Sequence, residues 1–154
     1  MIRHARPDDL DGILNVATHS TLFEHEEMEV FGHTIREFFA EEEPEHVWLV
    51  DEHLGAVSAV AYMGPEMADR VWNLFFISVL PELKGMGRGG ALLRHVEAQL
   101  VDLEQRMLVI DTSGLDGFEP TRAFYIKHGY TLSAQIPDFW ADGDDKVVFT
   151  KRLS

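Results

Sequence analysis

The segment from Phe75 to Leu93, FFISVLPELKGMGRGGALL, predicts a buried strand, a glycine-rich loop and the start of a helix in direct succession. The apolar run from Leu74 to Leu80 is typical of a buried strand, and Pro81 ends it because proline has no N–H to donate to a sheet. The apolar residues that follow recur at three- and four-residue steps, which predicts an amphipathic helix. They are Leu92, Leu93, Val96, Leu100 and Leu103.

Glycines fill the predicted loop, where Gly85, Gly87, Gly89 and Gly90 precede or open the helix. A helix N-terminus presents unpaired backbone N–H groups and the positive end of the helix dipole. Glycine lets a ligand approach that backbone closely, so the combination predicts an anion site, most often for phosphate. Glycines that only tighten a turn are the alternative, and four glycines in six residues argue against it.

Two phosphate-binding motifs compete for this loop. Gly85-x-Gly87-x-x-Gly90, with Asp111 at the end of the next apolar run, formally satisfies the dinucleotide fingerprint. In that fold the glycines form the tight turn directly after the strand, whereas Pro81 to Lys84 intervene here. A nicotinamide-binding oxidoreductase, using NAD or NADP, is therefore the less favoured interpretation.

The other motif fits the whole segment, which has the order Val79-x-Pro81-x-x-Lys84-Gly85-x-Gly87-x-Gly89-x-x-Leu92-Leu93. This order resembles the acyl-CoA-binding motif of the GNAT acetyltransferases, whose core is Arg/Gln-x-x-Gly-x-Gly/Ala. Lys84 stands where the family usually has arginine or glutamine. The resemblance implies acetyl-CoA as the co-substrate. The residues that it implies for CoA binding in this segment are Val79, Lys84, Gly85, Met86, Gly87, Arg88, Gly89 and Gly90.

A second segment, from Glu119 to Tyr130, resembles the C-terminal motif of the same family, Ala-x-x-Phe-Tyr-x-x-x-Gly-Phe/Tyr. Pro120 or Thr121 opens a short helix there, and Gly129 caps it. The resemblance implies that Thr121 and Phe124 contact CoA, although the family often has asparagine before the alanine. It also implies that Tyr125 is the general acid that protonates the CoA thiolate. A tyrosine packed in the core with a hydrogen-bonded hydroxyl is the alternative.

The acceptor side of the reaction rests on weaker patterns. Glu24 or Glu26, in the acidic run EHEEME, could be the general base that deprotonates the amine, and a solvated helix end is the alternative. Phe139 and Trp140, in the last predicted hairpin, could line the acceptor pocket or simply pack on the sheet. No His-x-x-x-His or EF-hand spacing occurs, so we expect no metal.

The fold class follows from the order of the patterns. Apolar runs at Val47–Val50 and Ala56–Tyr62 predict a hairpin, and the run at Met107–Ile110, followed by a loop at Asp111–Gly114, predicts a strand–helix–strand crossover. Asp142-Gly143 marks a turn between two closing strands. We therefore expect a single α/β (α+β) domain over residues 1–154. The GNAT resemblance, which covers nearly the whole chain, implies a mixed, mostly antiparallel sheet of about seven strands with about four helices.

Composition limits the partners. The 154 residues carry 27 acidic and 13 basic side chains, a net charge of −14, which repels nucleic acid and anionic membranes and attracts amines or polyamines. We expect no nucleic-acid or membrane partner, since no apolar stretch approaches a membrane span. The N-terminus lacks a signal-peptide pattern, so a cytoplasmic protein is expected. The absence of cysteine excludes disulfides and a cysteine nucleophile.

Together these features predict an N-acetyltransferase. The resemblance implies that it moves an acetyl group from acetyl-CoA to a primary amine by direct attack in a ternary complex. The acceptor classes that remain open are a small-molecule amine, a polyamine and a peptide N-terminus. A non-catalytic acyl-CoA-binding sensor or structural protein is the alternative from another class. Because dimers are common in the family, a homodimer is a further expectation.

Overall fold

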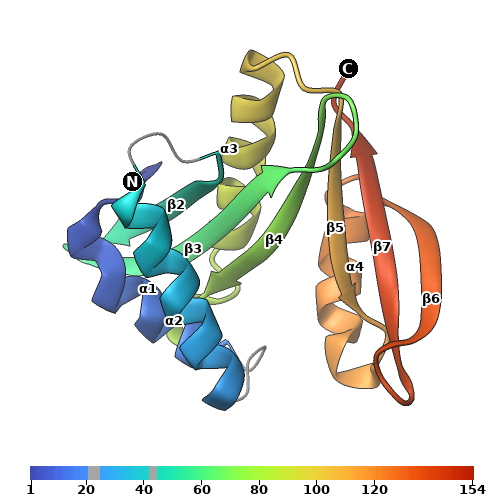
Figure 1. Cartoon of the computed structure of the whole chain (residues 1–154), viewed down its shortest axis with the longest axis horizontal. Helices are drawn as coiled ribbons and strands as arrows, with labels where there is room; N and C mark the ends of the chain where they lie inside the picture. The colour runs from blue at the N-terminus through green and yellow to red at the C-terminus, as the bar shows by residue number, and fades with distance from the viewer. Residues whose placement is uncertain (21–24, 42–44) are drawn as a thin grey trace. The chain divides into compact units, whose positions relative to one another are not determined.

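The computed structural model describes residues 1–20, 25–41 and 45–154 (Figure 1). Within these ranges seven strands form one mixed sheet in the order β1-β2-β3-β4-β5-β7-β6. Four α-helices accompany the sheet in the described ranges, in agreement with the number that the family resemblance implies, and the fold class is confirmed. The strands are β1 (Ile2–His4), β2 (Val47–His53), β3 (Ala56–Pro65), β4 (Val71–Val79), β5 (Met107–Ser113), β6 (Thr131–Ala141) and β7 (Asp144–Arg152). The helices are α1 (Leu10–Thr18), α2 (His25–Ala40), α3 (Arg88–Asp102) and α4 (Glu119–Lys127).

Strand pairing confirms the predicted crossover. β4 pairs with β5 in parallel, with Val71 opposite Met107, and α3 connects the two strands. The pairs β1–β2, β2–β3, β5–β7 and β6–β7 are antiparallel. The predicted loop at Asp111–Gly114 is wrong for its first three residues, because β5 continues to Ser113, which pairs with Lys146 of β7. This pairing joins segments far apart in the sequence, so local composition gave no sign of it.

The turn between β2 and β3 is also tighter than expected. β2 continues to His53, and Leu54 and Gly55 alone connect the strands, with φ angles of 52° and 80°. Two successive residues with positive φ are typical of the two-residue hairpin turns whose twist matches that of the strands. The predicted hairpin is confirmed, and its connection is shorter than the interval between the predicted runs Val47–Val50 and Ala56–Tyr62.

The described residues group into two compact units. Unit 1 comprises residues 1–64 and 76–96, and unit 2 comprises residues 65–75 and 97–154. β4 and α3 each contribute residues to both units. The expectation of a single domain stays a prediction.

Unit 1 has a core of aliphatic and aromatic side chains. Helices α1 and α2 lie against the hairpin of β2 and β3 (Figure 1). Phe31 of α2 contacts Trp48 of β2 edge to face, with ring centroids 5.4 Å apart, and Trp48 stacks on Tyr62 of β3 at 4.1 Å. The buried residues of this core are Ile13, Val16, Ala17, Phe31, Ile35, Trp48, Val50, Val57, Val60 and Phe76.

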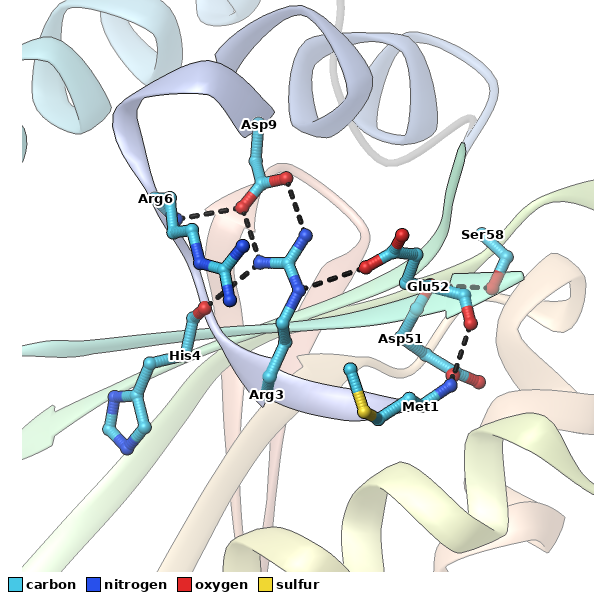
Figure 2. A network of polar contacts seen from close by, with 8 residues as sticks. All are labelled: Met1, Arg3, His4, Arg6, Asp9, Asp51, Glu52 and Ser58. Carbon is cyan, nitrogen blue, oxygen red and sulfur yellow. Dashed lines mark hydrogen bonds and ion pairs between the residues drawn. The ribbon is translucent and has the colours of Figure 1, made fainter. Parts of the chain in front are cut away.

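A polar network fixes the start of the chain onto β2 (Figure 2). Arg3 of β1 donates two hydrogen bonds to the Asp9 carboxylate, at 2.8 and 2.9 Å, and a third to Glu52 of β2 at 3.0 Å. The backbone N–H of Arg6 also donates to Asp9, at 2.7 Å. The hydrogen bonds from Arg3 hold the pKa of Asp9 below its ordinary value. The network therefore ties the turn before α1 to the sheet.

Unit 2 is built on β5, β7 and β6, which lie side by side in that order (Figure 1). Helix α4 supplies Tyr125 to a core that also holds Ile110 of β5 and Phe149 of β7. Gly129, with φ of +88°, follows α4 and ends it in the left-handed turn that the sequence predicts. Among the helices described, none is long and apolar enough to cross a membrane.

Candidate active site

The glycine-rich loop begins where β4 ends at Val79. A single 3₁₀ turn follows, in which the N–H of Leu83 bonds to the carbonyl of Leu80 at 2.9 Å. Gly85 and Gly87 then both adopt φ of +79°. A Cβ atom at either position would meet nothing within 4 Å, so the left-handed backbone, and not crowding, calls for glycine.

Six consecutive N–H groups, from Gly85 to Gly90, have no acceptor among the described residues. The first N–H of this region to be paired is that of Ala91, which bonds to the carbonyl of Gly87 at 3.0 Å. Unpaired N–H donors at the start of a 15-residue helix form the arrangement that binds phosphate groups. The geometry therefore fits an anion, as a CoA pyrophosphate requires.

Two cationic side chains belong to this loop, and they behave differently. Lys84 is exposed, and within the described part of the chain its side-chain ammonium group makes no hydrogen bond or ion pair. Arg88 instead directs its guanidinium to β2, where Nη1 donates to Asp51 at 2.9 Å and Nη2 donates to His53 Nδ1 at 2.6 Å. Lys84 is thus the loop cation that is available to a bound anion.

An open hollow of about 340 Å³ lies beside the loop within unit 1. Its lining residues are Met1, Ile2, Asp51, Met86, Gly87, Arg88 and Ala91. Met86 is 67% exposed, so its apolar side chain projects from the loop into solvent. The hollow gives a ligand direct access to the backbone at Gly87.

Asp111, the acidic residue of the dinucleotide alternative, is engaged elsewhere. It lies inside β5, where Asn73 Nδ2 donates to its carboxylate at 3.2 Å and Lys146 Nζ lies 3.6 Å away. Asn73 also donates to Glu66, at 2.7 Å. A carboxylate that already has an amide donor and a cation within the sheet is a poor partner for a ribose hydroxyl, so its surroundings favour the CoA interpretation of the loop.

Tyr125 lies in α4 and is 5% exposed. Its ring packs against those of Phe124, Tyr130 and Phe149, with centroids 5.5, 6.0 and 5.6 Å away. Its hydroxyl makes no hydrogen bond in the described ranges. The alternative, a core tyrosine with a hydrogen-bonded hydroxyl, therefore has no support among the described residues. Burial raises the pKa of Tyr125, and the hydroxyl therefore keeps its proton at neutral pH.

The neighbouring tyrosine belongs to a polar cluster that the sequence did not indicate. Tyr130 donates to Glu97 of α3 at 2.7 Å, and Lys151 of β7 lies 3.1 Å from the same carboxylate. Burial, followed by the bond to Glu97, raises the pKa of Tyr130. The three residues come from separate elements, so no local spacing in the sequence could have revealed the cluster.

The other residues proposed for CoA binding in unit 2 lie on α4. Thr121 and Phe124 are both partly buried, and the Phe124 ring also contacts His128, with centroids 4.5 Å apart. Arg122 donates to the carbonyl oxygens of Ser113 and Leu115, both at 2.8 Å. These bonds hold the start of α4 to the end of β5.

The candidate residues on the acceptor side are only partly described. Glu24 lies outside the described residues. The backbone of Glu26 belongs to the first turn of α2, and its side chain is not among the described groups. Phe139 and Trp140 of β6 are each 49% exposed and contact each other edge to face at 4.8 Å. Trp140 Nε1 donates to the Thr112 carbonyl at 3.2 Å. These two aromatic rings are held in place and still face solvent.

Lys146 Nζ lies 4.4 Å from the centre of the Phe139 ring. An aromatic face that attracts one cation can also attract the ammonium group of an amine. The pair Phe139 and Trp140 thus has chemistry that suits an amine acceptor. Among the described residues, no three or more His, Cys, Asp or Glu side chains come together as they would around a metal ion.

Comparisons with known proteins agree with the loop geometry. The model of the acetyltransferase (GNAT) domain matches residues 38–132. A 5-NmdU N-acetyltransferase of Pseudomonas phage PaMx11 is 27% identical over 136 residues, which cover 88% of this chain and 89% of the relative.

Solved structures are similar along the whole chain. A protein of Desulfovibrio desulfuricans assigned to the GNAT family has a TM-score of 0.93 and 25% identity, with 100% of this chain and 99% of that chain covered. An aminoglycoside 6'-N-acetyltransferase in complex with coenzyme A has a TM-score of 0.79 at 15% identity, with 100% and 97% covered. The second likeness is one of fold alone.

Proposed function

Because this chain belongs to the GNAT acetyltransferases, we propose that it moves an acetyl group from acetyl-CoA to a primary amine by direct attack in a ternary complex. The observation that carries the proposal is the row of six unpaired N–H groups from Gly85 to Gly90 at the start of α3. The acceptor is a small-molecule amine, a polyamine or a peptide N-terminus.

The loop binds the pyrophosphate of acetyl-CoA. Its N–H groups donate to the phosphate oxygens, and the helix dipole and the exposed Lys84 ammonium add positive potential. The end of β4 at Val79 supplies backbone groups for the amides of the pantetheine arm. On an acidic chain of net charge −14, this loop is a local site of positive potential.

The chemistry then needs a neutral amine. The nitrogen lone pair attacks the thioester carbonyl carbon, a C–N bond forms, and the C–S bond breaks to release the CoA thiolate. The amine loses one proton to a general base, for which Glu24 and Glu26 remain the candidates. The net products are an acetamide and free CoA.

Tyr125 supplies a proton to the departing thiolate. A thiol has an ordinary pKa of about 8.5, so its departure as a thiolate at neutral pH gains from a proton donor. The raised pKa of Tyr125 keeps it protonated and ready to donate. Its hydroxyl makes no hydrogen bond in the described ranges, so no bond within them has to be broken before it acts.

Phe139 and Trp140 contact the acceptor. Their rings are half exposed, and the position of Lys146 over Phe139 indicates that this surface attracts cations. The acidic surface attracts the same class of molecule from solution. The 5-NmdU of the phage relative is included among the acceptors to be tested.

The first test measures thermal stabilisation by acetyl-CoA, free CoA and NAD in parallel, because a ligand that binds only the folded state stabilises it. We expect both CoA compounds to raise the melting temperature and NAD to leave it unchanged. A protein that is stabilised by NAD and not by either CoA compound would instead support the nicotinamide-binding oxidoreductase. A thiol-release assay over an amine library follows. Binding of CoA without thiol release from any amine would favour the non-catalytic sensor.

A further inference from the structure

Arg88 occupies a position that suits phosphate binding, but its side chain is used elsewhere. Its N–H is one of the six unpaired donors, and its guanidinium lies against β2 within unit 1. Nη1 donates to Asp51 Oδ2 at 2.9 Å and Nη2 donates to His53 Nδ1 at 2.6 Å. A guanidinium can only donate, so His53 accepts through Nδ1 and carries its proton on Nε2.

The partners of Arg88 are themselves fixed. Asp51 is 5% exposed and also accepts a hydrogen bond from the Met1 ammonium group at 3.1 Å. The Ser58 hydroxyl donates to the backbone carbonyl of Asp51 at 2.7 Å, which ties this part of β2 to β3. The first residue of α3 is therefore attached to a pair of strands that are hydrogen-bonded to each other.

The Nε atom of Arg88 is buried and has no hydrogen-bond partner among the described residues. Burying an unsatisfied donor costs stability, and a buried ion pair adds little net stability of its own. Such a pair is better explained by the geometry that it fixes than by stability. What it fixes here is the first turn of α3, from which the N–H row projects.

We propose that Arg88 is a positioning residue, held by Asp51 and His53, that keeps the loop from Gly85 to Gly90 in its phosphate-binding conformation. This inference rests on the proposed function, because the bound group is the CoA pyrophosphate. Arg88 acts through the backbone N–H groups and makes no contact with phosphate. The competing role, in which Arg88 leaves Asp51 and binds phosphate directly, is an outcome of the test.

The two roles predict opposite effects for Asp51→Asn. In the positioning role this change weakens the attachment of α3, so the affinity for CoA falls about tenfold. In the direct role the change frees the guanidinium, so the affinity stays equal or rises. Arg88→Met lowers the affinity in both roles. The variant that carries both changes should bind no more weakly than either single variant, because the two residues act as one unit.

The experiment titrates free CoA into the wild type, the two single variants and the double variant by calorimetry, at two salt concentrations. Glu52→Gln is the matched control, since it removes the neighbouring carboxylate, which pairs with Arg3 and not with Arg88. It should bind CoA as the wild type does. Circular dichroism melts identify any variant that is not folded at the titration temperature. If Asp51→Asn is not folded, Asp51→Glu replaces it, because glutamate keeps the charge. Asp51→Glu should retain more affinity for CoA than Arg88→Met.

Kinetics give a second readout that a purely structural role would not produce. We expect Asp51→Asn to raise the KM for acetyl-CoA about tenfold and to change kcat less than twofold. The ratio of the affinities of wild type and Arg88→Met should not change with salt, since no phosphate contact is lost. Unchanged CoA affinity in Asp51→Asn, or a salt-dependent loss in Arg88→Met, would overturn the positioning role. A wild type that does not bind CoA at all would instead refute the proposed function.

Discussion

Arg88 Nη1 and Asp51 Oδ2 lie 2.9 Å apart, which joins the first residue of α3 to the middle of β2. The contact neutralises the charge of Arg88 at a carboxylate that is already buried. The backbone N–H groups of the loop and Lys84 are therefore the groups that attract an anion. This division of roles leads to predictions that separate the parts of the site.

Tyr125→Phe should lower kcat by about 100-fold, within the range for loss of a general acid, with little change in the KM for acetyl-CoA. The melting temperature should change little, because the Tyr125 hydroxyl has no hydrogen bond to lose in the described ranges. Steady-state kinetics with the best amine acceptor measure both parameters. A turnover number equal to that of the wild type would remove Tyr125 from the mechanism.

Tyr130→Phe is the matched control on the neighbouring ring. It removes the hydroxyl that donates to Glu97 at 2.7 Å, so it should lower the free energy of unfolding by about 1–3 kcal/mol. Its kcat should stay near the wild-type value. Urea denaturation and kinetics on both variants thus separate loss of the acid from loss of a structural bond.

The pH dependence of kcat gives an independent view of Tyr125. An ordinary tyrosine has a pKa of about 10, and burial raises that of Tyr125. Its protonated form is therefore present throughout the range from pH 7 to about 9.5. Deprotonation of Tyr125 should therefore cause no fall in kcat over this range, so the wild type and Tyr125→Phe should not differ by such a fall. A descending limb near pH 8 that is absent from the Phe variant would contradict the raised pKa.

Gly87→Ala should weaken CoA binding about 5- to 30-fold, since an L-residue held in the left-handed region costs about 1–2 kcal/mol. The Cβ would meet no atom within 4 Å, so the effect comes from the backbone alone. Gly117→Ala, equally open and without a positive φ, is the control and should bind CoA normally. Calorimetric titration of CoA into both variants measures their affinities. Equal affinities of Gly87→Ala and Gly117→Ala for CoA would show that the conformation of Gly87 does not matter for binding.

Lys84→Gln should weaken CoA binding by about 3- to 10-fold at low salt and by less at high salt, because an exposed charge is screened by ions. The unfolding free energy should stay unchanged, since Lys84 makes no ion pair in the described part of the chain. Dissociation constants at two ionic strengths measure the effect. A loss of affinity that is independent of salt would argue against an electrostatic contact.

Asp9→Asn should lower the free energy of unfolding at pH 7 by about 1–3 kcal/mol, because Arg3 then loses a charged acceptor. The folded-state pKa of Asp9 lies below its unfolded value, so its stabilisation is present above about pH 4 and is lost as the pH falls through the folded value. The stability difference between wild type and variant should therefore shrink below pH 4. A difference that is constant with pH would exclude this ionisation as its source.

Much of the fold could be predicted from local patterns. The strand, loop and helix from Val71 to Asp102, the short helix that ends before Gly129 and the closing hairpin all lie where composition and spacing place them. The extension of β5 to Ser113 could not be predicted, because it depends on pairing with β7, about 35 residues away.

The roles assigned to the candidate site residues stay predictions, and only part of the site's geometry has a local signal in the sequence. Glycine spacing indicates the anion loop, because a positive φ angle and a phosphate-binding helix N-terminus both favour glycine at neighbouring positions in the sequence. The partners of Arg88 leave no such trace, since Asp51 and His53 come from a different strand. The same holds for the pairing of Tyr130 with Glu97. Side-chain partners that are distant in the chain need the fold before they can be identified.

Mass spectrometry can test directly whether the protein transfers an acetyl group to an amine. The protein is incubated with acetyl-CoA carrying a ¹³C-labelled acetyl group and with a panel of polyamines, peptides with free N-termini and small-molecule amines that include 5-NmdU. We predict that at least one amine gains the labelled acetyl group, that CoA is released in equal amount, and that Tyr125→Phe slows both. Label that remains on CoA, or that appears only as free acetate, would contradict the account.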